Sequence, residues 1–334
     1  MRYLVTGGSG FIGSELIYQL LKLKNSQVVN VDNETYASNN KELKNLLSEY
    51  SYIKRRYNYY KFDINNKVKF SKLLLDFKPQ IIFHLAAESH VDNSIKSSNL
   101  FITTNINGTH NILRCVNEYL NQKKNLKIKF IHVSTDEVFG DCFDKKKKFD
   151  ENSIYSPSSP YSASKASSDL LVKAWQRTYD FPSIITNCSN NYGPRQNFEK
   201  LIPTIISAAL SKKTIPIYGD GSQIREWIHV TDHVKALILI SQKANLPNQY
   251  VIGSGYRVSN LSLANKICKI LNKYYPSNIK YENLIKFVPD RPGHDLVYSL
   301  NSKKIYKDLN WKTSISFFDG LKSTVDWYID RLKK

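Results

Sequence analysis

The chain has 334 residues, of which 41% are hydrophobic and 12% aromatic, a composition typical of a globular protein. A single hydrophobic core stops growing at about 250 to 300 residues, so the length predicts two closely joined parts. No apolar run reaches the roughly twenty residues that span a bilayer, and the N-terminus lacks the basic and then apolar profile of a signal peptide. We therefore expect a cytoplasmic protein with no membrane partner.

The chain is strongly basic, with 48 Lys and Arg against 29 Asp and Glu and a net charge of +19. Such a charge is also found in nucleic-acid-binding proteins. Here, however, the lysines are spread along the chain and are not interleaved with aromatic residues on one element. The densest run, Lys145 to Lys148, lies in a polar stretch before Pro157 and predicts a solvated loop. We expect no nucleic-acid partner, although the positive field should assist capture of a doubly charged diphosphate.

The four cysteines are scattered and form no Cys-x-x-Cys pair. They are Cys115, Cys142, Cys188 and Cys268. This spacing argues against a zinc site and against a disulfide framework. We expect no metal.

Glycines follow the first predicted strand, at residues 2–6. The motif Gly8-x-Gly10-x-x-Gly13 leads from this strand into a helix predicted over 14–24. Glycines let such a turn approach a pyrophosphate closely and let the helix point its N-terminal N–H groups at negative charge. The arrangement predicts a dinucleotide site, and a glycine-rich turn without a ligand is the alternative.

An acidic residue ends the second predicted strand, at residues 27–31. Asp32 lies about twenty residues past the glycines. A carboxylate at this place accepts hydrogen bonds from the adenosine ribose hydroxyls and repels a 2′-phosphate. The predicted cofactor is therefore NAD and not NADP.

Strands and helical patterns alternate through the first half of the chain. Further strands are predicted at 58–62, 80–85, 127–134 and 182–188. This alternation predicts an α/β fold with a doubly wound parallel sheet (Rossmann), whose ligands bind beyond the carboxyl ends of the strands. Candidate functional residues directly follow three of these strands, at Asp63-Ile64, at 86–90 and at 134–137.

The alternation loosens after about residue 190, where Pro and Gly residues break the chain into short elements. We expect residues 1–190 to form the NAD-binding Rossmann domain, with a return segment near 228–252. Residues 191–334 should form a smaller C-terminal substrate-binding lobe that covers the crevice.

A Tyr-x-x-x-Lys motif, Tyr161 to Lys165, predicts a proton-transfer site. Pro160 suits the first turn of a helix, on which residues i and i+4 share a face. Free tyrosine titrates near pH 10, but a nearby Lys charge and a cationic nicotinamide ring favour the phenolate. Thr135 can hold a substrate alcohol between Tyr161 and the cofactor. The alternative is an exposed helix that carries Tyr and Lys incidentally.

Two adjacent carboxyls, Asp136 and Glu137, follow the fifth predicted strand. They face the same crevice as Tyr161 and can divide into acid and base if burial or repulsion keeps one of them protonated. A plain alcohol dehydrogenase has no use for such a pair. The alternative is a polar turn after a strand.

Family motifs are spread over nearly the whole chain. They are Thr6–Gly13, His84–Asp92, Asn105–Thr109, Ser134–Gly140, Tyr161–Lys165, Asn187–Pro194, Glu199–Pro203, Pro216–Gly219 and Asp290–His294. With these motifs the chain resembles the extended short-chain dehydrogenase/reductases and, within them, the nucleoside-diphosphate-glucose 4,6-dehydratases. The Thr135-Asp136-Glu137 triplet separates these dehydratases from the sister sugar epimerases. One departure is Phe198, where the family usually has Pro, and it concerns the rim of the nucleotide pocket.

The resemblance implies a hydro-lyase of the EC 4.2.1 class that acts on dTDP-glucose or UDP-glucose and recycles NAD. Tyr161 would take the proton of the 4-hydroxyl as C4 is oxidised. Glu137 would then remove the C5 proton while Asp136 protonates the departing 6-hydroxyl, and C6 would be reduced. The 4-keto-6-deoxyglucose nucleotide would feed deoxysugar biosynthesis, such as that of rhamnose. Thymidine and uridine differ by one methyl group, so the base stays open.

The resemblance also implies a homodimer and three sets of site residues. The catalytic set is Thr135, Asp136, Glu137, Tyr161 and Lys165. The NAD set is Gly7, Gly10, Phe11, Ile12, Gly13, Asp32, Asp63, Ile64, Leu85, Ala86, Ala87, Ser89, Thr104, Tyr161, Lys165 and Asn191. The sugar-nucleotide set is Ser89, Thr135, Asn190, Lys200, Leu201, Pro216, Tyr218, Arg225, Asn260, Arg291 and His294. Arg225 and Arg291 offer planar forks suited to diphosphate oxygens.

Three other functions remain as alternatives. A sugar-nucleotide 4-epimerase shares the fold and Tyr161 but needs neither Asp136 nor Glu137, so loss of water distinguishes the two enzymes. A non-catalytic dinucleotide-binding module has no need of Thr135, Tyr161 and Lys165 together. A nucleic-acid-binding protein would retain RNA with a steep dependence on salt.

Overall fold

The computed structural model describes residues 1–48, 54–123, 127–142 and 147–332. Its largest element is a seven-stranded sheet in the order β10-β6-β5-β4-β1-β2-β3, in which every neighbouring pair is parallel. The strands are β1 (Arg2–Thr6), β2 (Gln27–Asp32), β3 (Tyr57–Lys61), β4 (Ile81–His84), β5 (Lys129–Thr135), β6 (Ser183–Cys188) and β10 (Asn248–Ile252). The predicted doubly wound parallel sheet is confirmed, and its first six strands lie within two residues of their predicted bounds.

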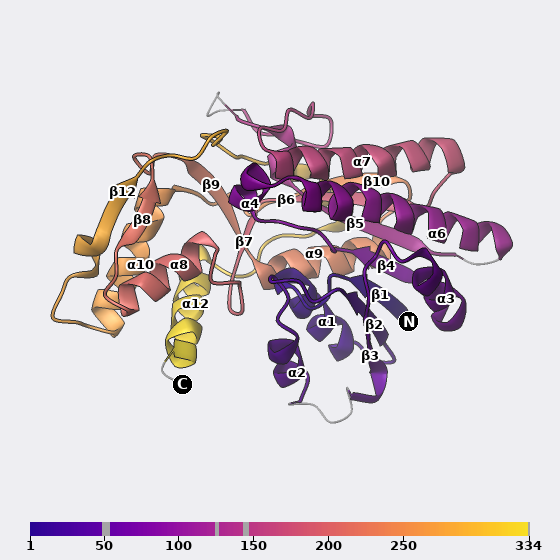
Figure 1. Ribbon diagram of the computed structural model, residues 1–334, viewed down its shortest axis with the longest axis horizontal. Helices are drawn as coiled ribbons and strands as arrows, with labels where there is room; N and C mark the ends of the chain where they lie inside the picture. The colour runs from indigo at the N-terminus through magenta and orange to yellow at the C-terminus, as the bar shows by residue number, and fades with distance from the viewer. Residues whose placement is uncertain (49–53, 124–126, 143–146, 333–334) are drawn as a thin grey trace.

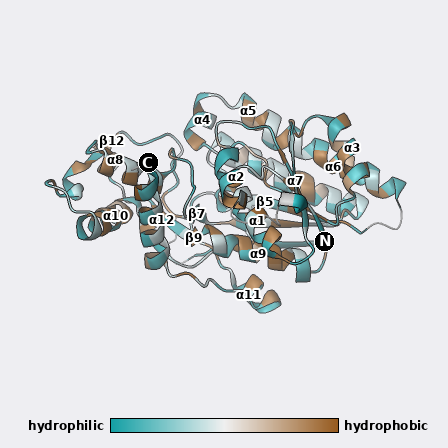
Figure 2. Cartoon of the chain, turned by 90° about the horizontal axis from the view of Figure 1, so that it is seen from below, coloured by the Kyte–Doolittle hydropathy of each residue, from teal (hydrophilic) through white to brown (hydrophobic). Residues whose placement is uncertain are grey.

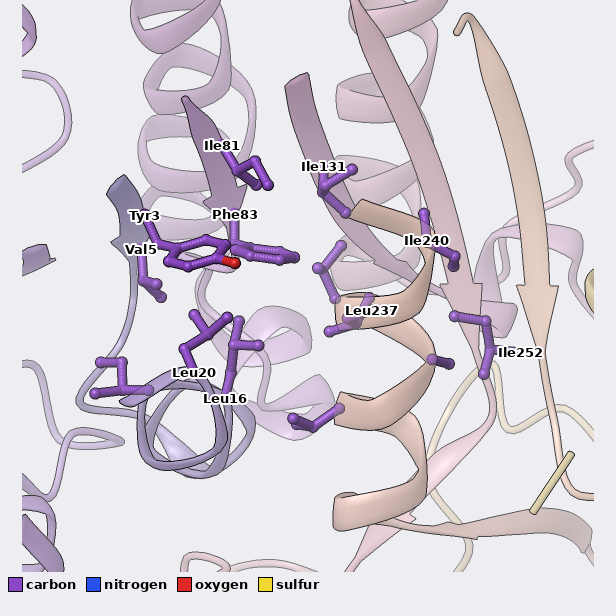
Figure 3. Packing of buried hydrophobic residues seen from close by; sticks show 14 of the residues in the cluster. Tyr3, Val5, Leu16, Leu20, Ile81, Phe83, Ile131, Leu237, Ile240 and Ile252 are labelled. Atoms are coloured by element: carbon purple, nitrogen blue, oxygen red, sulfur yellow. The ribbon is translucent and has the colours of Figure 1, made fainter. Parts of the chain in front are cut away.

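Helices cover both faces of this sheet (Figure 1). One face carries α1 (Phe11–Lys22), α9 (Val230–Lys243) and α11 (Lys303–Leu309), and the other carries α3 (Lys67–Phe77), α6 (Thr109–Gln122) and α7 (Pro160–Tyr179). The sheet is buried on both sides, and Figure 3 shows Phe83 of β4 and Leu237 of α9 in the first of these layers. The helix α2 (Asn40–Ser48) packs beside α1.

The helix after the glycine motif begins earlier than predicted, at Phe11 and not at residue 14. Gly10 has an extended backbone and is the N-cap, so Gly13 lies inside the first turn of the helix. A Cβ atom at Gly13 would lie 2.3 Å from the carbonyl oxygen of Gly7, which explains the glycine. The hydrophobic periodicity missed this first turn because its side chains face the turn and the cleft.

Short helical segments follow two of the strands. They are α4 (Val91–Lys96), α5 (Asn99–Phe101) and the π-helix η2 (Ile102–Gly108) after β4, and η3 (Asp136–Phe139) after β5; η1 (Lys54–Arg56) directly precedes β3. Of the lysine run predicted to be a solvated loop, Lys147 and Lys148 are exposed and lie in a loop, and Lys145 and Lys146 lie outside the described residues.

The second lobe lies beside the large sheet, and Figure 2 shows α8, α10 and α12 gathered at one end of the molecule. Its strands are β7 (Asn190–Tyr192), β9 (Ile224–His229) and β11 (Arg257–Ser259) in one small sheet, and β8 (Ile215–Tyr218) and β12 (Ile285–Val288) in another. Its helical segments are α8 (Leu201–Leu210), α10 (Asn260–Tyr274), η4 (Tyr281–Leu284) and α12 (Phe317–Leu332). Between these elements the chain returns to the large sheet through α9 and β10.

None of the helices in the described ranges combines the length and the hydropathy of a membrane span.

Candidate active site

A cleft lies at the carboxyl ends of the parallel strands, where ligands of a doubly wound sheet bind. Its volume of about 300 Å³ is at the lower end of the range for ligand pockets. It brings together every residue predicted for NAD and for catalysis: Gly7, Gly10, Phe11, Ile12, Gly13, Asp32, Asp63, Ile64, Leu85, Ala86, Ala87, Ser89, Thr104, Thr135, Asp136, Glu137, Tyr161, Lys165 and Asn191. The roles of these residues stay predictions.

The glycine turn forms a cradle at one end of the cleft. Gly7 has a φ of +71°, and a Cβ atom there would lie 2.6 Å from the backbone nitrogen of Ala86. A Cβ atom at Gly10 would meet only the carbonyl oxygen of Gly7, at 3.4 Å, so Gly10 leaves open space on the cleft side. The first turn of α1 carries no acidic residue that would neutralise its N–H groups. The cradle therefore fits the pyrophosphate of a dinucleotide.

Asp32 is held rigidly at the end of β2. Its two carboxylate oxygens accept hydrogen bonds from the backbone N–H of Ser9 at 2.9 Å, from the backbone N–H of Glu34 at 2.8 Å and from the hydroxyl of Ser38 at 2.6 Å. An ionised carboxylate can accept about four hydrogen bonds. Asp32 therefore keeps capacity for a ribose hydroxyl and presents negative charge where a 2′-phosphate would lie.

Tyr161 and Lys165 lie one turn apart on α7, which begins with Ser159 as N-cap and Pro160 in its first turn. Both side chains are buried, and the ammonium of Lys165 donates a hydrogen bond to the carbonyl of Val133 at 2.9 Å. Burial raises the pKa of Tyr161 well above its usual value, and the charge of Glu137 adds to this, while a hydrogen bond with Thr135 opposes it. Burial therefore sets the direction of this pKa for the protein groups, and the predicted lowering by the charges of Lys165 and a nicotinamide ring stays a prediction.

Asp136 and Glu137 begin the short helix η3, where the hydroxyl of Thr135 accepts a hydrogen bond from the backbone N–H of Glu137 at 3.2 Å. The same hydroxyl lies 3.3 Å from Oδ1 of Asp136. The other oxygen of Asp136 has no hydrogen-bond partner among the described residues. The strand end and the cap of η3 thus place both carboxyls at the cleft.

The surroundings of the two carboxyls differ. Burial raises the pKa of Asp136 well above its usual value, and the charge of Glu137 raises it further. Burial also raises the pKa of Glu137, but the positive charges of Arg291, Arg225 and Lys200 oppose the rise. Asp136 is therefore the group that holds its proton, and Glu137 is the group that ionises first.

The residues predicted for the sugar nucleotide divide into two groups. Ser89, Thr135, Asn190 and Lys200 line the cleft, whereas Leu201, Pro216, Tyr218, Arg225, Asn260, Arg291 and His294 belong to the second lobe and lie outside its lining. Two of the second group reach the first lobe through Asp92 of α4. Its carboxylate accepts a hydrogen bond from the hydroxyl of Tyr218 at 3.0 Å and lies 3.4 Å from a guanidinium nitrogen of Arg291.

Arg225 differs from the expectation of an open planar fork. Its guanidinium is buried, donates to the backbone carbonyls of Ile224, Asp295 and Leu296, and lies 4.2 Å from the ring centre of Tyr298. With its donors committed in this way, Arg225 acts on Glu137 through its charge. The sequence could not predict this, because residues 295 and 296 come seventy positions later in the chain.

Further residues line the cleft that the sequence did not assign to any site. Among them are Glu88, Cys188, Gln196, Asn197 and Glu199. Cys188 ends β6, so the same strand-end rule that located Asp136 could have located it. Phe198, which departs from the family pattern, packs against Tyr328 of α12 with a ring separation of 5.3 Å.

Comparison with known proteins agrees with this geometry. The model of the GDP-mannose 4,6 dehydratase family matches residues 4–324. A dTDP-glucose 4,6-dehydratase from Haemophilus influenzae is 46% identical over 98% of both chains. A probable dTDP-glucose 4,6-dehydratase from Sinorhizobium fredii is 45% identical over 99% of this chain and 93% of its own.

Solved structures show the same likeness. The dTDP-glucose 4,6-dehydratase DesIV from Streptomyces venezuelae, solved with NAD bound, has a TM-score of 0.90 and is 37% identical, over 100% of this chain and 98% of that chain. A UDP-glucuronic acid 4-epimerase from Bacillus cereus has a TM-score of 0.85 and is 28% identical, over 99% and 100% of the two chains. The fold is thus shared with epimerases, while the family match and the full-length relatives point to dehydratases. The chain belongs to the GDP-mannose 4,6 dehydratase family, and its relatives over nearly the whole length are dTDP-glucose 4,6-dehydratases.

Proposed function

We propose that this protein is an NAD-dependent NDP-glucose 4,6-dehydratase, a hydro-lyase that converts dTDP-glucose or UDP-glucose to the 4-keto-6-deoxyglucose nucleotide and water. The observation that carries the proposal is the unequal pair Asp136 and Glu137 in the same cleft as Tyr161 and Lys165. An epimerase or a plain dehydrogenase has no step for such a pair. The full-length dehydratase relatives support the same conclusion.

The residues of the chain divide the reaction into oxidation and elimination. When bound, NAD supplies a hydride acceptor for the first step and a hydride donor for the last. With the positive charges of Lys165 and of the bound cofactor favouring its phenolate, Tyr161 takes the proton of the 4-hydroxyl as C4 becomes a carbonyl, and this carbonyl acidifies the C5 hydrogen. Glu137 then removes the C5 proton, and Asp136 gives its proton to the 6-hydroxyl, which leaves as water. After C6 is reduced, C5 regains a proton.

The protonation states fit these roles. Because burial and the charge of Glu137 raise the pKa of Asp136, this carboxyl keeps its proton at pH values where an ordinary aspartic acid is ionised. The three cations around Glu137 favour its ionised form. The pair therefore offers one acid and one base at the same pH.

The reaction and the preference for thymidine or uridine are tested by supplying dTDP-glucose and UDP-glucose separately to the purified enzyme. We expect a product lighter than the substrate by one water, with a carbonyl at C4, and we expect dTDP-glucose to react faster because the full-length relatives act on it by name. The measurement is mass spectrometry of the sugar nucleotide together with initial rates. A product of unchanged mass would indicate an epimerase, and equal rates would mean that this enzyme does not select between the two nucleotides.

We further propose that the protein forms a homodimer through the face formed by α5, η2 and α7. Leu100, Ile102 and Leu170 lie on these neighbouring segments and are 52%, 43% and 56% exposed, and exposed apolar side chains that gather in one region mark interaction surfaces. Analytical ultracentrifugation should give a dimer for the unaltered protein and a monomer for Leu170→Glu. Phe287→Glu, at an exposed apolar position on β12 of the other lobe, is the matched control and should remain dimeric.

A cytoplasmic location is part of the same proposal. All four cysteines lie in the described part of the chain, and each is buried outside any disulfide. Cysteines kept as thiols fit a reducing compartment.

A further inference from the structure

A buried carboxylate lies behind the pair Tyr161 and Lys165, in the layer between α7 and the large sheet. Asp169 is fully buried and follows Lys165 on α7 by four residues, as Lys165 follows Tyr161. Residues at this spacing share one face of a helix. All three side chains are buried, so this face of α7 is turned toward the sheet.

Two neutral groups form hydrogen bonds with Asp169, and a third lies beside it. Oδ2 accepts hydrogen bonds from the hydroxyl of Tyr155 and from the side-chain amide of Asn187, both at 3.0 Å. Oδ1 lies 3.1 Å from Nε2 of His132. Burial lowers the pKa of His132, and the charge of Lys165 lowers it further, so the ring is neutral and does not cancel the charge of Asp169.

The hydrogen bonds continue from Asp169 to the active site. The amide of Asn187 also donates to the carbonyl of Thr135 at 3.2 Å, and its oxygen accepts from Gln249 at 2.8 Å. Asp169 is therefore connected through Asn187 to the backbone of a cleft residue, and it lies on the same buried face of α7 as Lys165. A surface ion pair has no comparable network, and Asp169 plays no part in the reaction steps proposed above.

Lys165 needs such a partner, because a buried ammonium without an anion loses its proton. Around Lys165, in the described ranges, lie the carboxylate of Asp169, the thiol of Cys188 and the rings of His84 and His132. The two rings are neutral because burial lowers their pKa values. Burial raises the pKa of Cys188 to about 12, so the thiol is also uncharged. Asp169 is the remaining anion.

We propose that Asp169 acts on the active site as a positioning residue, the buried counter-ion on the same face of α7 that keeps Lys165 charged beside Tyr161. It acts through Lys165 and touches neither substrate nor cofactor. The role of the lysine rests on the proposed function, whereas the pairing of the two charges does not.

Replacement of Asp169 by its neutral isostere gives the first test. Asp169→Asn removes the anion, so Lys165 should lose its proton at lower pH and the alkaline limb of log kcat/KM should move down by about 1 to 3 pH units. The matched control is Tyr155→Phe, which removes a neutral hydrogen bond to the same carboxylate. This control should lower the melting temperature of the protein without shifting the alkaline limb of log kcat/KM. An Asp169→Asn enzyme that is less active but has an unshifted limb would overturn the proposal.

A stability cycle tests the charge pair without any activity. It compares the unaltered protein with Asp169→Asn, Lys165→Met and the double variant by thermal unfolding. Each single variant leaves one buried charge alone, so the double variant should be more stable than the sum of the two single losses predicts. This comparison remains informative if a single variant folds poorly. Additive losses would overturn the pairing, whereas failure of the dehydratase assay alone would affect only the proposed function.

Discussion

Glu137→Gln should bind the sugar nucleotide and reduce the nicotinamide, yet release almost no 4-keto-6-deoxy product. Oxidation at C4 uses Tyr161 and the hydride acceptor, so it does not need this carboxylate. Elimination needs a base at C5, and removal of a general base costs about a hundredfold to ten-thousandfold in rate. The reduced nicotinamide, followed by its absorbance, should therefore accumulate on addition of substrate and persist.

A matched control for this variant is Glu151→Gln. Glu151 is another carboxyl whose pKa is raised by burial, and it accepts a hydrogen bond from the backbone N–H of Val251 at 2.9 Å, away from the cleft. Its neutral variant should lose some stability and keep normal turnover. Normal product formation by Glu137→Gln itself would contradict the role of Glu137 as the base.

Tyr161→Phe should leave the nicotinamide oxidised after substrate is added, whereas Glu137→Gln should reduce it. The phenol takes the first proton of the reaction, so its loss stops every later step, again by about a hundredfold to ten-thousandfold. Stopped-flow absorbance during the first turnover measures this directly. Because oxidation precedes elimination, the double variant with Glu137→Gln should remain as inactive as Tyr161→Phe.

Tyr250→Phe is the control for the loss of a buried tyrosine hydroxyl. Tyr250 is fully buried on β10, and its hydroxyl lies 3.2 Å from Asp308, outside the cleft. This variant should unfold at a lower temperature and still reduce the nicotinamide at a normal rate. Appreciable reduction of the nicotinamide by Tyr161→Phe would assign the first proton to another group.

Local patterns were enough to predict the fold and to bring several cofactor and catalytic residues to one cleft. The glycine motif, the alternating strands and the Tyr-x-x-x-Lys spacing each depend on neighbours within a few residues, and parallel strands bring their carboxyl ends to one edge. For this reason the sequence alone predicts that Asp32, Asp136 and Tyr161 share one cleft, as they do in the structure. The start of α1 was missed because its first turn, Phe11 to Gly13, belongs to the glycine motif that was read as the turn before the helix.

Properties that depend on distant segments could not be predicted in this way. The guanidinium of Arg225 is occupied by carbonyls about seventy residues later in the chain. The pKa of Tyr161 depends first on the depth of burial, which a helical spacing does not report. Asp169 is another example, because its neighbours His132, Tyr155 and Asn187 come from separate parts of the sequence.

The contact between Asp92 and Arg291 joins the two lobes at a residue predicted to bind the diphosphate. Arg291 already has an anionic neighbour at 3.4 Å, and the same carboxylate accepts the hydroxyl of Tyr218. A diphosphate that bound at Arg291 would compete with Asp92 for one cation, so its net gain in binding free energy would be the difference between the two interactions. Ligand binding at this position would therefore be coupled to the contact that links α4 to the second lobe.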